Sequence, residues 1–275
     1  MQNLRHDNLY LNRFSILLAF LALGFALIYL LPTDVGAEAI EILGIQFEFS
    51  FFNLIPILLA LLGAVGAIWV FATHPKWRNE RLTFLRLLPH LMLPFIAIMI
   101  LSIVLRQSAR SLIWWVVFLT GYSIVALLLR AEYVLIEDSG INSLGYSILV
   151  ISAAFGLYLL LTIALKNSNV RMIAQFLLIF LAGLFVSFRL LSLQGGGKDS
   201  LLNSLLASIM VTQLAVALHY IFVPPIQYGL LLTGLLYSLS SWMSQYKSDK
   251  KWQQYTEPIV MSLVTLVLIV ISLLV

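Results

Sequence analysis

The amino-acid sequence alternates between apolar blocks of about 18–23 residues and short polar segments. An α-helix rises about 1.5 Å per residue, so a block of this length covers most or all of a bilayer core about 30 Å thick. The chain is 61% hydrophobic and 10% charged, whereas soluble domains average about 45–50% and roughly 25%. A soluble core could not bury this much apolar side chain. We therefore predict an all-α protein, a polytopic transmembrane helix bundle that forms one integral membrane domain over residues 1–275.

Nine apolar blocks are long enough to be spans. The predicted spans are residues 14–31, 52–73, 87–105, 112–129, 144–165, 172–191, 202–223, 226–242 and 258–275. The eighth is the shortest, and it follows Pro224 and Pro225, which interrupt a helix because proline lacks the N–H group. The alternative is an eight-span arrangement in which one of these segments is re-entrant.

The lysines and arginines are unevenly divided between alternate loops. With the N-terminus in the cytoplasm, 12 of the 16 lie inside and 4 lie outside. The inner set is Arg5, Arg13, Lys76, Arg78, Arg81, Arg86, Arg130, Arg189, Lys198, Lys247, Lys250 and Lys251, and the outer set is Arg106, Arg110, Lys166 and Arg171. The positive-inside rule favours this orientation. We expect a multi-pass protein of the cell (inner) membrane, with its N-terminus cytoplasmic and its C-terminus external.

The longest predicted external loop covers residues 32–51 and has no basic residue. Apolar and polar side chains alternate from Ile45 to Phe51, which predicts a short β-like element, a strand or hairpin, with Gly44 at the turn. The element is either a cap over the helix ends or a docking edge for a partner strand. The loop also carries a candidate external acidic set, Asp34, Glu38 and Glu41.

Ionisable residues are costly inside a membrane and are functional candidates by default. The proposed topology brings one such set to the cytoplasmic side: His74, Arg86, His90, Arg130, Glu132 and Arg189. In one interpretation Arg189 pairs with Glu132, Arg86 extends to the headgroups, and the set is structural. In the other it is a pocket for a lipid phosphate or a carboxylate.

A second, smaller polar group surrounds Pro224 and Pro225 toward the outer side. It comprises Gln213, His219, Tyr220, Gln227 and Tyr228. A lone histidine beside an aromatic belt is more often an interfacial residue than a ligand, so this group is the weaker candidate.

Several kinds of chemistry have no signature in the chain. There is no cysteine, which excludes disulfides, thiolate metal sites and cysteine nucleophiles. The sequence has no Walker loop, no H-E-x-x-H and no G-x-S-x-G motif. We predict no catalytic residue, no metal and no cofactor. The net charge is only +4, and the basic residues lie at the ends of apolar blocks. The expected partners are therefore membrane lipids and, where the chain joins a complex, other membrane subunits, and not nucleic acid.

Four short stretches resemble a family of uncharacterised bacterial multi-span membrane proteins, chiefly from Chloroflexota, known only as a domain of unknown function. They are WVFATHP at 69–75, LPHLMLP at 88–94, RAEY at 130–133 and FRLL at 188–191. The resemblance covers most of the chain. It implies a multi-span fold and implies no reaction.

The sequence leaves three functions open. The leading hypothesis is a non-enzymatic membrane protein, either a structural or assembly component of a membrane complex or a lipid-binding component. The second is a glycosyltransferase-like enzyme acting on a lipid-linked substrate, with its acid among Asp34, Glu38 and Glu41. The third is a small-molecule transporter that uses the cytoplasmic-side polar cluster, although no internal repeat supports it.

Overall fold

The computed structural model describes residues 2–30, 38–42, 45–49, 54–74, 84–108, 110–136, 141–168, 172–193, 199–221 and 223–245, together with 259–260, 262–264 and 267. These residues form two compact units, unit 1 (Met1–Tyr146) and unit 2 (Ser147–Val275). The single domain expected over residues 1–275 stays a prediction.

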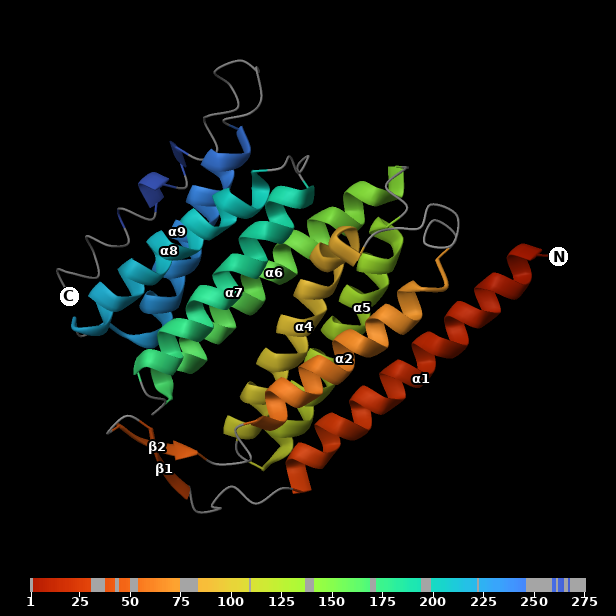
Figure 1. The fold of residues 1–275 in the computed structure, drawn as a ribbon, viewed down its shortest axis with the longest axis horizontal. Coiled ribbons are helices and arrows are strands. Elements are labelled where there is room, and N and C mark those ends of the chain that lie inside the picture. Colours follow the sequence, from red (N-terminus) through yellow and green to blue (C-terminus); the bar gives the residue numbers. More distant parts are fainter. Residues whose placement is uncertain are drawn as a thin grey trace. The chain divides into compact units, whose positions relative to one another are not determined.

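Both units are built from long helices. Unit 1 contains α1 (Gln2–Leu30), α2 (Ile55–Phe71), α4 (Phe84–Gln107) and α5 (Leu112–Leu135), coloured from red to green in Figure 1. The next helix, α6 (Ile141–Asn167), begins in unit 1 and continues into unit 2. Unit 2 adds α7 (Met172–Leu193), α8 (Ser200–His219) and α9 (Pro225–Gln245).

Six helices in the described part of the chain are long and apolar enough to cross a membrane. They are α1, α4, α5, α6, α7 and α8, and α2 is a shorter apolar helix of 17 residues. This composition fits a membrane protein. Most of the ninth predicted span, residues 258–275, lies outside the described residues.

Local sequence explains several helix boundaries. Pro56 lies in the first turn of α2, where a missing N–H group costs nothing. The side chain of Ser111 caps α5 by accepting a hydrogen bond of 3.3 Å from the Ile113 backbone N–H. Helix α9 begins at Pro225, as the predicted break at the proline pair requires. Pro89 and Pro94 both lie inside α4, where each removes one backbone hydrogen bond.

The region with alternating polarity contains two short strands, β1 (Glu38–Ile42) and β2 (Ile45–Phe49). They pair antiparallel, with Glu38 opposite Phe49 and Ile42 opposite Ile45. The predicted turn residue Gly44 lies outside the described residues.

Glycines bring the helices of unit 1 into close contact. A Cβ atom at Gly66 of α2 would clash with Leu17 of α1, and one at Gly63 would clash with Ile98 of α4. Neighbouring Ala67 is fully buried. Small residues at this spacing let helices pack closely in a membrane. In Figure 1 α1 and α2 run side by side, and contacts between the two helices agree.

Unit 2 packs around a seam of small and polar side chains. Gly183 of α7 faces Ser208 of α8 and the hydroxyl of Tyr158. The Ser187 hydroxyl, also on α7, lies 3.3 Å from the backbone carbonyl of Ser204 on α8 and donates a hydrogen bond to it. Gly229 of α9 fits against α6.

Candidate functional site

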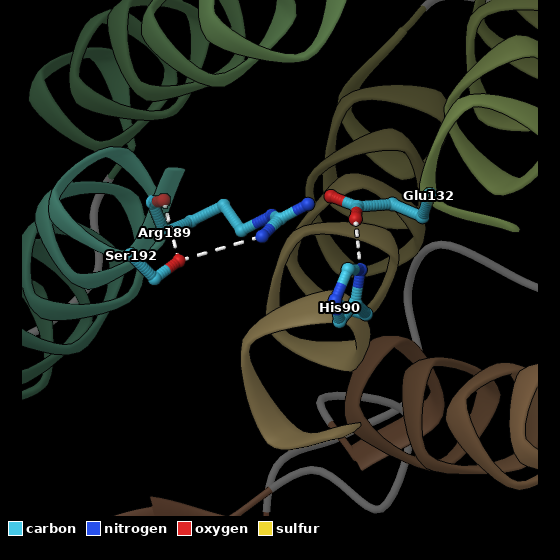
Figure 2. Close-up of polar contacts among 4 residues, drawn as sticks. All are labelled: His90, Glu132, Arg189 and Ser192. Carbon is cyan, nitrogen blue, oxygen red and sulfur yellow. Dashed lines mark hydrogen bonds and ion pairs between the residues drawn. The ribbon is translucent and has the colours of Figure 1, made fainter. Parts of the chain in front are cut away.

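The polar centre of unit 1 is a histidine–carboxylate pair between α4 and α5. His90 Nδ1 lies 3.0 Å from Glu132 Oε2, and the Glu132 side chain is completely buried (Figure 2). His90 lies in the first two turns of α4 and Glu132 in the last turn of α5, so both belong to the same end of the antiparallel helix pair. The bond therefore joins the two helices at that end.

The direction of the hydrogen bond depends on which of the two groups carries the proton. An ionised carboxylate can only accept, so Nδ1–H of His90 then donates to Glu132. A protonated Glu132 would instead donate to the unprotonated Nδ1. A buried carboxylate requires such a partner because its desolvation is costly. Chemically, the arrangement can hold a proton and fix the orientation of the imidazole ring.

A chain of rings surrounds Tyr133, the residue after Glu132. The rings of Tyr133 and Tyr10 are stacked with centroids 4.1 Å apart, and His74 meets Tyr133 edge to face at 5.0 Å. Phe14 continues the stack from Tyr10 at 5.5 Å. The buried Tyr10 hydroxyl has no hydrogen-bond partner among the described residues. This aromatic cluster connects α1, α5 and the residues just after α2.

Arg13 fastens α1 to α2 beside the aromatic cluster. Its Nη1 donates a hydrogen bond of 2.9 Å to the backbone carbonyl of Trp69. The guanidinium carbon also lies 4.9 Å from the centre of the Trp69 ring, a cation–π distance. Arg13 thus donates a hydrogen bond to a carbonyl near the C-terminus of α2 and covers the exposed ring of Trp69.

The remaining members of the predicted cluster are placed differently. Arg130 is exposed on α5, and Arg86 lies in α4 with its side chain outside the described residues. Arg189 belongs to unit 2, where it is buried and its Nη1 donates to Ser192 Oγ at 3.4 Å (Figure 2). Unit 1 therefore pairs His90 with Glu132 and places the His74 ring against Tyr133, the residue after Glu132. The full six-residue cluster and the Arg189–Glu132 pair stay predictions.

The candidate external acids are described only in part. Glu38 and Glu41 lie in β1, where Glu41 is opposite Gln46, and their side chains are outside the described residues. Asp34 is outside them altogether. A catalytic role for this set stays a prediction. Over the described part of the chain, no three His, Cys, Asp or Glu side chains come together as a metal site would require.

A large apolar groove lies between α1 and α2 in unit 1. Its volume is about 540 Å³. The lining residues are Phe20, Leu23, Gly24, Ala26, Leu27 and Leu30 of α1, and Ile55, Leu58, Leu59 and Leu62 of α2. Gly24 forms part of the floor, because a Cβ atom there would lie 2.5 Å from Leu59 Cδ1. No side chain in the lining carries a polar group, so the groove fits a hydrocarbon.

The sequence pointed to His90 and Glu132 as members of one polar cluster but not to the bond between them, and it gave no sign of the groove or of Tyr10. The cost of ionisable groups in a membrane pointed to His90 and Glu132. No comparable signal marks the groove, since leucine and phenylalanine on α1 look alike whether they face a groove, a helix or lipid. Tyr10 lies before the predicted first span and gave no reason to be singled out.

Comparison with known proteins gives one match. A family model described as "Protein of unknown function (DUF5656)" matches residues 35–272. The chain belongs to this family. The match covers α2 to α9, and therefore both the histidine–carboxylate pair and most of unit 2. No curated protein and no solved structure matches the chain. Membership in the family and the six apolar helices together describe a membrane protein of unknown activity.

Proposed function

We propose that this chain is a non-enzymatic, lipid-binding component of a membrane, and that it holds one alkyl chain of a lipid in the groove between α1 and α2. The groove carries the proposal. It is about 540 Å³ in volume, and none of the ten residues that line it has a polar side chain.

The surroundings of the groove favour a lipid chain as its occupant. Helix α1 is apolar enough to span a membrane, and the groove lies within that apolar part. Leu23, Leu27 and Leu30 on its rim are exposed, so a hydrocarbon can enter from the side. Lipid tails are the hydrocarbon that surrounds such a helix in a bilayer, and a concave apolar surface gives them more contact than a flat one.

In this proposal the His90–Glu132 pair is structural. It holds the end of α4 against α5, and α4 packs on α2, which forms one wall of the groove. Because the carboxylate of Glu132 is buried beside His90, it would repel a phosphate at the same point. An anion pocket centred on Glu132 is therefore the less favoured interpretation of the cluster.

The proposal includes a topology with nine spans in a bacterial inner membrane. The N-terminus is cytoplasmic, the C-terminus is external, and the strands β1 and β2 lie on the outer side. Support comes from the 12 to 4 division of the 16 basic residues between the two sides. The His90–Glu132 pair then lies toward the cytoplasm, and the groove toward the outer leaflet.

The experiment that tests the proposal is to fill the groove. The variant Ala26→Phe places a ring among the lining residues, whereas Ala19→Phe on the same helix places it at an exposed position outside the groove. Native mass spectrometry of the full chain, purified in a mild detergent, counts the lipids that stay bound. We expect one retained lipid on the wild-type chain and on Ala19→Phe, and several-fold lower occupancy on Ala26→Phe. Equal lipid retention by all three proteins would refute the proposal.

A second candidate function, proton-coupled transport of a small molecule, is favoured by one observation. The buried His90–Glu132 pair can hold a proton, and it lies beside Pro89 and near Pro94, which interrupt the backbone bonding of α4. Transport predicts that Glu132→Gln abolishes uptake into proteoliposomes driven by a pH gradient while lipid retention stays normal. The lipid-binding proposal predicts that Ala26→Phe changes lipid retention and that Glu132→Gln does not.

A further inference from the structure

Helix α8 has one exposed stripe, and a polar side chain lies in the middle of it. The opposite face of the helix, which includes Val211 and Ala215, is buried in unit 2. Helix α8 is long and apolar enough to span a membrane, so in a bilayer the exposed stripe faces acyl chains unless another helix covers it. The stripe recurs with the helical period and consists of Leu206, Ile209, Met210, Gln213, Ala217 and Tyr220.

Gln213 lies well inside the apolar span. Six residues, about 9 Å of helix, separate it from His219 at the C-terminal end of α8, and the N-terminal end is farther away. The Cα–Cβ bonds of a helix are tilted toward its N-terminus, which directs the Gln213 side chain away from the nearer membrane surface. Its amide group is therefore poorly placed to reach the polar headgroups.

The amide of Gln213 makes no hydrogen bond to any residue that the structure describes. Exposed hydroxyls on another span are satisfied differently. Thr120 on α5 donates to the Val116 carbonyl of its own helix at 2.6 Å. Ser123 donates to the Leu119 carbonyl at 2.7 Å. An amide left unbonded in hydrocarbon is costly, so Gln213 requires a partner from outside the described residues.

A second copy of this chain supplies a matching partner. A primary amide carries both a donor and an acceptor, so two copies of Gln213 related by a two-fold axis can form reciprocal N–H···O bonds. Copies that share one orientation in the membrane also place Gln213 at the same depth. A helix of a different protein would need its own donor and acceptor at that depth.

The surroundings of Gln213 allow two identical stripes to meet. Ala217, one turn along the stripe, is exposed and small, and small residues let membrane helices approach closely. Residues 200–220 contain no lysine, arginine, aspartate or glutamate. No like charges therefore oppose the pairing of the stripe with its own copy.

We propose that two copies of this chain associate through the exposed stripes of α8, with the two Gln213 amides hydrogen-bonded to each other at the two-fold axis. This dimer goes beyond the lipid binding proposed above. It uses residues of unit 2 alone, whereas the groove belongs to unit 1. Lipid retention reports on the groove and self-association reports on α8, so each proposal can fail without the other.

The test is the self-association of the full chain in vesicles of phosphatidylethanolamine and phosphatidylglycerol. Each chain carries one dye on a cysteine added before Met1, and stepwise photobleaching counts chains at increasing ratios of protein to lipid. We expect the wild-type chain to dimerise and Gln213→Leu to dimerise at least about tenfold more weakly, because two interhelical hydrogen bonds are lost. Thr120→Val is the matched control, since that exposed hydroxyl is bonded within its own helix. A wild-type chain that stays monomeric at every ratio, or equal dimerisation of Gln213→Leu, would overturn the proposal.

A second variant changes the fit of the stripes and leaves the amide in place. Ala217→Leu adds bulk one turn from Gln213 and should weaken dimerisation several-fold by holding the two helices apart. Ala19→Leu adds the same bulk at an exposed position on α1 and should dimerise as wild type. Unchanged dimerisation of Ala217→Leu would overturn the proposal.

Single cysteines locate the contact, because the natural chain has none. Met210→Cys lies one turn before Gln213 on the same stripe, so mild oxidation in vesicles should link two copies through a disulfide. Leu119→Cys, on α5, is the control at another exposed position of a span. A disulfide at Leu119→Cys and none at Met210→Cys would place the contact on a different helix and overturn the proposal.

Other occupants of the stripe give different results in the same experiments. If a different membrane protein, or the predicted span 258–275 of the same chain, bonded Gln213, the purified chain would stay monomeric in vesicles. Gln213→Leu would then lower the retention of that protein or the thermal stability of the chain, and would leave self-association unchanged. Either result would overturn the proposal.

Discussion

The imidazole of His90 and the carboxylate of Glu132 meet at 3.0 Å between α4 and α5, at a point where Glu132 has no contact with solvent. A buried carboxylate that lost this bond would keep the cost of its desolvation. The pair is thus a buried polar link between these two helices.

A double-mutant cycle measures that link. We expect Glu132→Ala to lower the free energy of unfolding by about 1–3 kcal/mol, the range for a hydrogen bond to a charged or buried group. His90→Ala should cost a similar amount, and the double variant should cost clearly less than the sum of the two. Unfolding in mixed detergent and denaturant provides the three values. Additive effects would show that the two side chains act independently.

The contact between α6 and α9 should be sensitive to one methyl group. A Cβ atom at Gly229 would lie 2.7 Å from Ile163 Cγ1, 3.0 Å from Leu159 Cδ1 and 3.2 Å from the Thr162 hydroxyl. Because three side chains would have to move together, we expect Gly229→Ala to destabilise the protein by about 1–3 kcal/mol.

Gly156→Ala is the matched control for Gly229→Ala, since open space surrounds Gly156 on α6. There the methyl group should be neutral or stabilise the helix by about 0.5–1 kcal/mol, because alanine loses less entropy than glycine on folding. Thermal denaturation of the two variants beside the wild-type chain checks both values. Equal stability of the two would contradict the close packing at Gly229.

Arg13 should not be replaceable by lysine. It donates to the Trp69 carbonyl and lies over the Trp69 ring, and a lysine ammonium cannot do both with the same geometry. We expect Arg13→Lys to lower stability by about 0.5–1 kcal/mol although the charge is kept. The control is Arg130→Lys, a change at an exposed arginine that should be neutral. Comparison of the two melting temperatures decides, and a neutral Arg13→Lys would count against the dual contact.

The proposed orientation can be tested with single cysteines, because the natural chain has none and gives no background. We expect a membrane-impermeant thiol reagent to label Glu41→Cys in intact cells, and Lys76→Cys only after the cells are opened. Opening the cells should equalise the two signals, which controls for reactivity. Labelling of Lys76→Cys from outside would reverse the topology and move the histidine–carboxylate pair to the outer side.

Much of the helical architecture could be predicted, because the length of an apolar block is enough to identify a segment that can cross a bilayer. The apolar block at residues 112–129 corresponds to α5, but the helix continues to Leu135. Hydropathy could not show this, since the extension contains Arg130 and Glu132 and is held by backbone bonding and by His90.

The sites were harder to predict than the helices. Buried Gln175 and exposed Gln213 both lie in long apolar helices, and most residues around each are apolar. In a soluble helix a polar face would mark the outside, but a membrane helix lacks that contrast. Only the packing of α7, α8 and α9 shows which glutamine points inward. His90 and Glu132 could be singled out because placing an ionisable side chain in a membrane costs free energy on any face of a helix.

The stack of Tyr10 on Tyr133 limits the order in which the helices of unit 1 can assemble during synthesis. Helix α1 is made first, yet its ring partner is near the end of α5 and exists only after α2 and α4 have been made. During synthesis α1 can first dock on α2 through Arg13 and Leu17, and only later close onto Tyr133. Helix α1 therefore gains its full set of contacts in unit 1 only once α5 has been made.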